Sequence, residues 1–165
     1  MTGTKLIKAG RFVEDAFVTL GDDDPQPANG TIVSLARFEK ERDALVSRNA
    51  PLGVRLKSDE SPERLGDDVN RLSVIVLEFP KFRDGRAFSW ARMLRTRLGF
   101  KGEIRATGHF LYDQLAFMAR VGIDAFEVPE GFAIAEFDRA MGEITNVYQP
   151  SADGRPTIRQ LRADG

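Results

Sequence analysis

Residues 74–107 read VIVLEFPKFRDGRAFSWARMLRTRLGFKGEIRAT, and this stretch decides the fold. Its first six residues are almost all apolar and rich in β-branched side chains, which is typical of a strand buried on both faces. Pro80 ends that strand, and apolar residues at helical spacing follow as far as Gly99, where a left-handed cap is expected. A second short strand begins at Glu103. The stretch therefore predicts two parallel strands joined by a helix.

The same alternation continues on both sides of this unit. Strands are expected to start near residues 32, 53, 74, 103 and 123, with helices over 34–48, from Ser61-Pro62, and over 86–98, 110–121 and 129–142. Starts about 20 to 30 residues apart suit repeated βα units, and about five strands are too few to close an eight-stranded (β/α) barrel. We expect an α/β fold in which βα repeats form an open, mostly parallel sheet flanked by helices. The alternative is a half (β/α) barrel that pairs with another element.

Three regions are expected along the chain. Residues 1–30 predict an N-terminal β arm and an exposed loop rich in Asp, Pro and Gly. Residues 31–146 form the α/β core domain. Residues 147–165 are interpreted as a C-terminal tail that packs loosely or docks on a partner.

Composition excludes several classes of function. The chain has 165 residues, a net charge of −1, no cysteine and one histidine, His109. Disulfides, thiolate catalysis and iron–sulfur clusters held by this chain alone are thus excluded, and we expect neither a metal nor a cofactor. Bulk charge does not favour nucleic acid, and no apolar run reaches the ~20 residues of a membrane span. We expect a cytoplasmic protein with neither nucleic-acid nor membrane partners.

Arginine is unusually frequent, at 18 residues against 6 lysines. Its planar fork of donors matches the oxygens of carboxylate, phosphate or sulfate groups. A codon bias toward arginine is the plain alternative. The question is whether some of these arginines converge in space.

The candidate site lies where ligands bind in open α/β sheets, beyond the carboxyl ends of the strands. If strands 74–79 and 103–107 are neighbours, basic side chains crowd one rim, and helix starts near residues 86 and 110 add backbone donors. The expected anion- or partner-binding residues are Lys81, Arg83, Arg86, Arg105 and Gln114. The alternative is that these charges are solvated, or form a structural lattice of salt bridges.

Acid–base chemistry has weaker support. The candidates are Asp84, Glu103, His109 and Asp113. Glu78 and Glu103 would lie at opposite edges of a parallel sheet, which argues against a shared metal site. Neither a dinucleotide or phosphate-binding glycine loop nor a nucleophile elbow is present.

Short motifs in order give a family resemblance. They are Phe79 to Arg86, Phe88-Ser89, Ala91-Arg92, Leu94-Arg95, Gly102 to Gly108, Asp113-Gln114, Gly122 to Phe126, and Tyr148-Gln149. Over about residues 70–150 the chain resembles the bacterial family called domain of unknown function 934. The matching positions include Asp84-Gly85-Arg86, Arg95, Glu103 and Arg105. Where the family usually has Asp-Val after Gly108, this chain has His109-Phe110, which argues against His109 as a family-wide catalyst.

The resemblance implies a setting in sulfur metabolism. Genes of this family typically lie beside those for assimilatory sulfite reductase, and members are often labelled oxidoreductases of sulfite reduction. It implies an accessory protein of sulfite reduction and cysteine biosynthesis. Its expected partners are sulfite reductase components, or an oxyanion such as sulfite, sulfate or phosphate. The alternatives are a small enzyme acting on an anionic metabolite, and a structural homodimer module.

Overall fold

A computed structural model describes residues 4–25, 29–81, 84–110 and 112–142. These residues form one eight-stranded sheet in the order β2-β1-β8-β7-β6-β5-β4-β3. The strands are β1 (Thr4–Lys8), β2 (Arg11–Val13), β3 (Phe17–Thr19), β4 (Gly30–Ser34), β5 (Leu52–Leu56), β6 (Val74–Phe79), β7 (Glu103–Gly108) and β8 (Ala125–Pro129). The helices are α1 (Leu35–Lys40), α2 (Arg42–Val46), α3 (Arg86–Thr96), α4 (Leu115–Arg120) and α5 (Ile134–Gly142), with 3₁₀ segments η1 (Pro62–Arg71) and η2 (Tyr112–Gln114).

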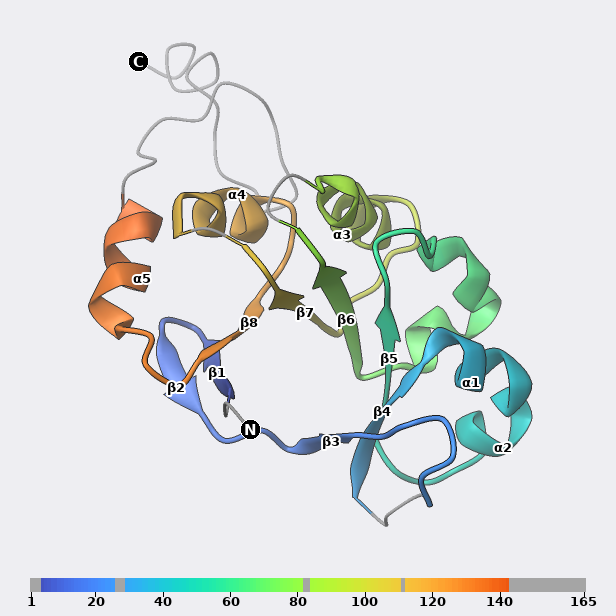
Figure 1. The fold of residues 1–165 in the computed structure, drawn as a ribbon. Coiled ribbons are helices and arrows are strands. Elements are labelled where there is room, and N and C mark those ends of the chain that lie inside the picture. The colour runs from blue at the N-terminus through green and yellow to red at the C-terminus, as the bar shows by residue number, and fades with distance from the viewer. Residues whose placement is uncertain (1–3, 26–28, 82–83, 111, 143–165) are drawn as a thin grey trace.

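The sheet is mixed, curled and flanked by helices. Strands β3 to β8 run parallel to one another, whereas β1 is antiparallel to both β2 and β8. The strands form an arc, and the helices lie on its outer side (Figure 1). The predicted α/β class with N-terminal strands is confirmed. The sheet keeps two edges, as an open sheet does, and its curl makes it a half-barrel.

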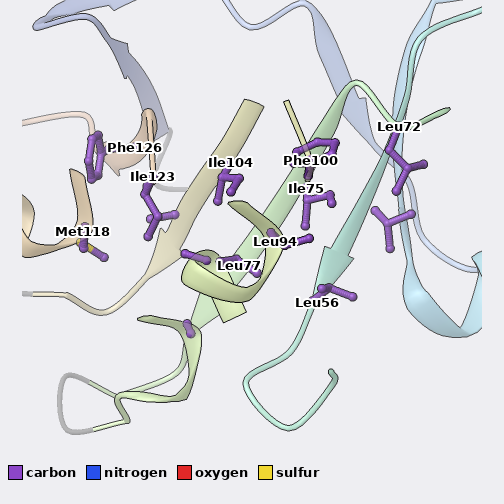
Figure 2. Packing of buried hydrophobic residues seen from close by; sticks show 14 of the residues in the cluster. Leu56, Leu72, Ile75, Leu77, Leu94, Phe100, Ile104, Met118, Ile123 and Phe126 are labelled. Carbon is purple, nitrogen blue, oxygen red and sulfur yellow. The ribbon is translucent and has the colours of Figure 1, made fainter. Parts of the chain in front are cut away.

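Strand β6 shows why this sequence is buried on both faces. Ile75, Leu77 and Phe79 belong to the core between the sheet and the helices, where Leu94 of α3 packs (Figure 2). Val74 and Val76 face the inside of the arc in a second, smaller cluster with residues of β3 and β4. Each face therefore removes apolar side chains from water, at roughly 25 cal/mol per Å² buried.

The side chains of strand β7 alternate between the two faces of the sheet. Ile104 and Ala106 belong to the core beneath the helices. Arg105 lies between them in sequence and so points to the opposite face, inside the arc, opposite Val76 of β6. The inner face of the half-barrel thus holds an arginine at the middle of its sheet.

The two edge strands are consecutive in the chain. β2 ends at Val13 and β3 begins at Phe17, although they lie at opposite ends of the strand order. Residues 14–16 therefore run from one edge of the curled sheet to the other. We call these three residues the edge link.

Three helix predictions differ from the structure. The single helix over 34–48 is two short helices, because the backbone of Glu41 leaves the helical region (φ −113°, ψ 22°). The segment from Ser61 is a 3₁₀ helix interrupted at Gly66 (φ 63°). The last helix begins at Ile134 rather than residue 129, because Pro129 pairs with Thr4 in the sheet.

A helix starting at Phe110 is also not formed. The Phe110 ring packs edge-on against Phe79 and Phe126, with centroids 6.0 and 6.3 Å apart. The 3₁₀ segment η2 begins at Tyr112, and Phe110 precedes it with its ring packed against the core. The predicted tail at 147–165 lies outside the described residues. Within the described ranges, every helix is too short or too polar to cross a membrane.

Candidate functional site at the carboxyl ends of the strands

The loops that follow β6 and β7 are tied together at their first residues. The backbone N–H of His109 donates to the carbonyl of Phe79, with N and O 2.6 Å apart. Gly108 has a φ of +105°, and a Cβ there would lie 2.4 Å from the Phe79 carbonyl oxygen. Only glycine fits this close approach without strain. Lys81 and His109 therefore leave the sheet from adjacent loops.

The loop after β5 is joined to the same rim through Asp84 and Arg86. The Asp84 carboxylate accepts from Nε and Nη2 of Arg86, at 3.0 and 2.8 Å. Arg86 Nη2 also donates to the Ser58 hydroxyl at 3.0 Å. Trp90, one turn along α3, donates from its indole nitrogen to the Ser58 carbonyl at 2.9 Å. The guanidinium of Arg86 is thus held in a fixed orientation.

These contacts set the charge state of Asp84. The hydrogen bonds from Arg86, and then from Ser58, hold the pKa of Asp84 well below its usual range. The hydrogen bond to Asp84 likewise raises the pKa of Arg86. A carboxylate held ionised is a good acceptor and a poor proton donor near neutral pH. Asp84 therefore orients Arg86 in this structure.

Three donor side chains face outward from this rim. The Arg86 side chain is 56% exposed, and its Nη1 has no acceptor among the described residues. Lys81 and His109 are exposed, and neither side chain has a partner in the described part of the chain. We call Lys81, Arg86 and His109 the rim donors. Arg83 lies outside the described residues.

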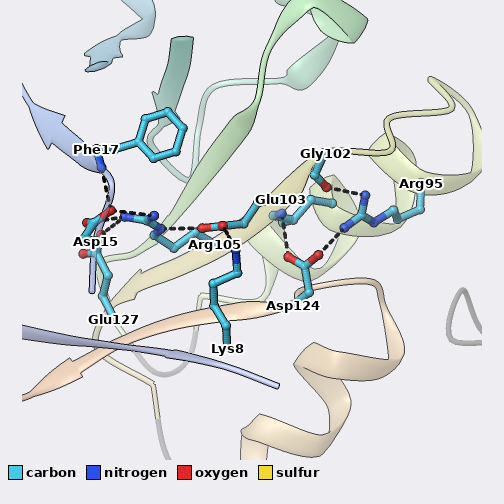
Figure 3. A network of polar contacts seen from close by, with 10 residues as sticks. Lys8, Asp15, Phe17, Arg95, Gly102, Glu103, Arg105, Asp124 and Glu127 are labelled. Atoms are coloured by element: carbon cyan, nitrogen blue, oxygen red, sulfur yellow. Dashed lines mark hydrogen bonds and ion pairs between the residues drawn. The ribbon is translucent and has the colours of Figure 1, made fainter. Parts of the chain in front are cut away.

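Arg105 lies apart from the rim donors, inside the arc. It is three residues before the end of β7 and 1% exposed. Its Nη1 and Nη2 donate to the two carboxylate oxygens of Asp15, at 2.7 and 3.1 Å, and its Nε donates to Glu103 at 2.8 Å (Figure 3). Nη1 also reaches Glu127 at 3.3 Å. The Phe17 ring lies over the guanidinium, 6.0 Å from Cζ to the centroid.

Two further side chains complete this inner network. Lys8 forms an ion pair with Glu103 at 2.6 Å, and the Thr107 hydroxyl donates to Glu127 at 2.7 Å. Burial alone would lower the pKa of Arg105, but the hydrogen bonds to Asp15 and Glu103 outweigh it and raise the pKa. Arg105 therefore stays charged at neutral pH and well above it, and it serves as a fixed cation that holds three carboxylates.

The remaining candidates are separate from one another. Glu103 is engaged by Arg105 and Lys8, so the pairing of Glu103 with Arg105 is present, as is that of Asp84 with Arg86. Asp113 is exposed and Gln114 is half-buried on η2, ahead of α4. The described residues hold no cluster of three metal-ligating side chains. The guanidinium of Arg105 lies among the three surrounding carboxylates, in the position that a bound metal cation would take.

Sequence reasoning missed Asp15, Glu127 and Lys8. Asp15 is 90 positions from Arg105, and no local pattern joins them. The alternation of β7 offered one signal, because a charged residue between Ile104 and Ala106 requires partners if that strand is central.

Residues 53–158 match the model of a family described as "Bacterial protein of unknown function (DUF934)". The chain belongs to this family. The matched range contains the rim donors and Arg105, whereas Asp15 and the edge link precede it. A comparison with curated proteins finds no match.

Proposed function

We propose that this DUF934 protein is an accessory protein of assimilatory sulfite reduction, and that it binds an acidic surface of the reductase through the rim donors. The observation that carries the proposal is the state of Arg86. Asp84 and Ser58 fix its guanidinium, while one edge of the fork remains exposed. An arginine whose side-chain entropy is already lost binds a partner carboxylate at lower cost.

The neighbours of Arg86 suit a protein partner. Trp90 is half-buried beside it, and arginine and tryptophan are the residue types that dominate binding energy in protein interfaces. Lys81 and His109 add donors from the two tied loops. Carboxylates on a partner surface would supply the acceptors that these donors lack.

An isolated oxyanion is a less favoured ligand. The fork of Arg105 is filled by Asp15, and two nitrogens of Arg86 are bonded to Asp84. To bind two nitrogens of one guanidinium, as an anion with no other surface to hold it would need, a free sulfite or sulfate would have to displace an attached carboxylate, which has a high effective concentration. A partner carboxylate can instead reach the exposed edge of Arg86 with both pairs intact.

The sulfite-reduction setting comes from the family resemblance. The composition supports an accessory role within it. Because the chain has no cysteine, the iron–sulfur and siroheme chemistry of the reduction must be carried by another protein. A protein that assists such an enzyme needs an interface, and the rim supplies one.

Affinity purification from the native bacterial cell, grown on sulfate as sole sulfur source, tests this proposal. The tagged wild type is compared with Arg86→Ala and with Arg97→Ala. Arg97 is the matched control, because it too is an exposed arginine with one carboxylate partner, Glu63 at 2.7 Å. We expect sulfite reductase subunits with the wild type and Arg97→Ala, and little with Arg86→Ala.

The other outcomes are equally informative. Equal recovery with all three proteins would show that the rim is not the docking face. No recovery, together with calorimetric binding of sulfite that Arg86→Ala abolishes, would replace the partner with an oxyanion. No recovery and no oxyanion binding would overturn the proposal.

A further inference from the structure

An apolar cavity of about 630 Å³ lies beside α5, away from the rim. The turn between β1 and β2, the end of α4 and the residues before β8 form its other walls. Its lining includes Ala119, Ile123, Phe126, Phe137 and Met141. Cavities of this size with mostly apolar walls are binding sites in many proteins, because covering them removes apolar surface from water.

The chain leaves α5 at the wall of this cavity. Phe137 and Met141 lie one turn apart on α5 and both line it. The helix ends at Gly142, and the sequence continues from residue 143 to residue 165. The segment after α5 therefore starts next to a residue that lines the cavity.

The sequence beyond α5 continues the apolar pattern of the helix. Ile134, Phe137 and Met141 are followed by Ile144 and Tyr148, at alternating steps of three and four residues. This spacing places apolar side chains on one helical face. In the sequence, two large apolar residues thus continue the pattern of the face that lines the cavity.

The family match independently includes this segment. It extends to residue 158, well past the end of α5. The unit that defines the family therefore contains both the cavity walls on α4, β8 and α5 and the residues that follow them.

We propose that the cavity is the docking site for the chain's own segment after α5, with Ile144 and Tyr148 as its apolar anchors. Docking completes the core on this side of the half-barrel. It is independent of the rim donors, so the rim proposal and this one can fail separately.

Hydrogen exchange of the full chain tests the docking directly. We expect backbone amides after residue 143 to exchange at least about tenfold more slowly than in an unstructured peptide. Ala119→Arg places a long charged side chain in the cavity wall, and that protection should then be lost. Phe117→Arg is the control, because Phe117 is on the same helix but 53% exposed, and protection should be kept.

A second variant leaves the described core unchanged. Ile144→Asp combined with Tyr148→Asp should remove the protection and let a hydrophobic dye bind the opened cavity. Unprotected amides in the wild type would overturn the proposal, as would protection that survives both Ala119→Arg and the double variant. Protection that depends on protein concentration would also overturn it, because it would assign the cavity to a second copy of the chain.

Discussion

Arg105 and Asp15 form a two-point ion pair across the inside of the half-barrel, with nitrogen–oxygen distances of 2.7 and 3.1 Å. Asp15 belongs to the edge link, which joins the two edge strands of the sheet. The pair therefore fastens that link to the middle of β7. A charged contact, rather than a further strand, covers the inner face of the sheet at this point.

Replacing Arg105 with Met should be strongly destabilising. It leaves the carboxylates of Asp15, Glu103 and Glu127 close together without their cation, at an expected cost of about 3–5 kcal/mol in the free energy of unfolding. Urea unfolding followed by circular dichroism measures this. The control is Arg97→Met, which breaks an exposed ion pair and should cost at most about 1 kcal/mol. Equal losses for the two variants would contradict the role given to Arg105.

Gly108→Ala should break the close contact between the loops that follow β6 and β7. The added methyl would lie 2.4 Å from the Phe79 carbonyl oxygen, at a backbone φ of +105°. We expect the free energy of unfolding, measured by thermal unfolding, to fall by about 2 kcal/mol or more. Gly85→Ala is the comparison, because a Cβ at Gly85 meets nothing within 4 Å. A neutral Gly108→Ala would show that the tie between the loops is not needed.

Arg95→Lys should be destabilising although the charge is kept. Arg95 donates to the carbonyls of Phe100, Gly102 and Gly122, at 2.7 to 3.1 Å, and so joins the loop before β7 to the loop before β8. A lysine cannot reproduce this planar fork, and we expect a loss of about 2 kcal/mol by urea unfolding. Arg92→Lys, at an exposed position of the same helix, should be close to neutral. If Arg95→Lys were neutral too, the hydrogen bonds from Arg95 to these three carbonyls would have no measurable effect on stability.

Stability at low pH should depend on Asp84. Its pKa is lowered in the folded state by the hydrogen bond from Arg86, so the ionised form stabilises the fold above the unfolded pKa of about 4. That contribution is lost as the pH falls below this value. Asp84→Asn should therefore lose less stability than the wild type between about pH 6 and about pH 3. In the Arg86→Ala background the substitution should change the pH profile little, and an unchanged difference there would contradict the cause given.

Much of the fold follows from local pattern. The apolar runs at residues 74–79 and 103–107 become adjacent parallel strands, and Gly99 has the positive φ expected after a helix. The curl of the sheet depends on strand twist summed over eight strands, and no single segment encodes it. The start of α5 at Ile134 could not be predicted from local pattern either, because it depends on the pairing of Pro129 with β1.

The candidate site was predicted in part. The loops after β6 and β7 could be placed together, because consecutive βα units bring the carboxyl ends of their strands to one edge. The partners of Arg105 could not, because Asp15 precedes it by 90 residues and no local pattern joins the two. Long-range ion pairs have no spacing rule that sequence alone can supply.

The most direct test of the proposed function is a binding titration of the purified protein against purified assimilatory sulfite reductase. Wild type and Arg97→Ala should bind with similar dissociation constants, and Arg86→Ala should bind about tenfold or more weakly. Circular dichroism of the three proteins ensures that folding is equal. Equal affinity for all three, or no binding by the wild type, would contradict docking through the rim donors.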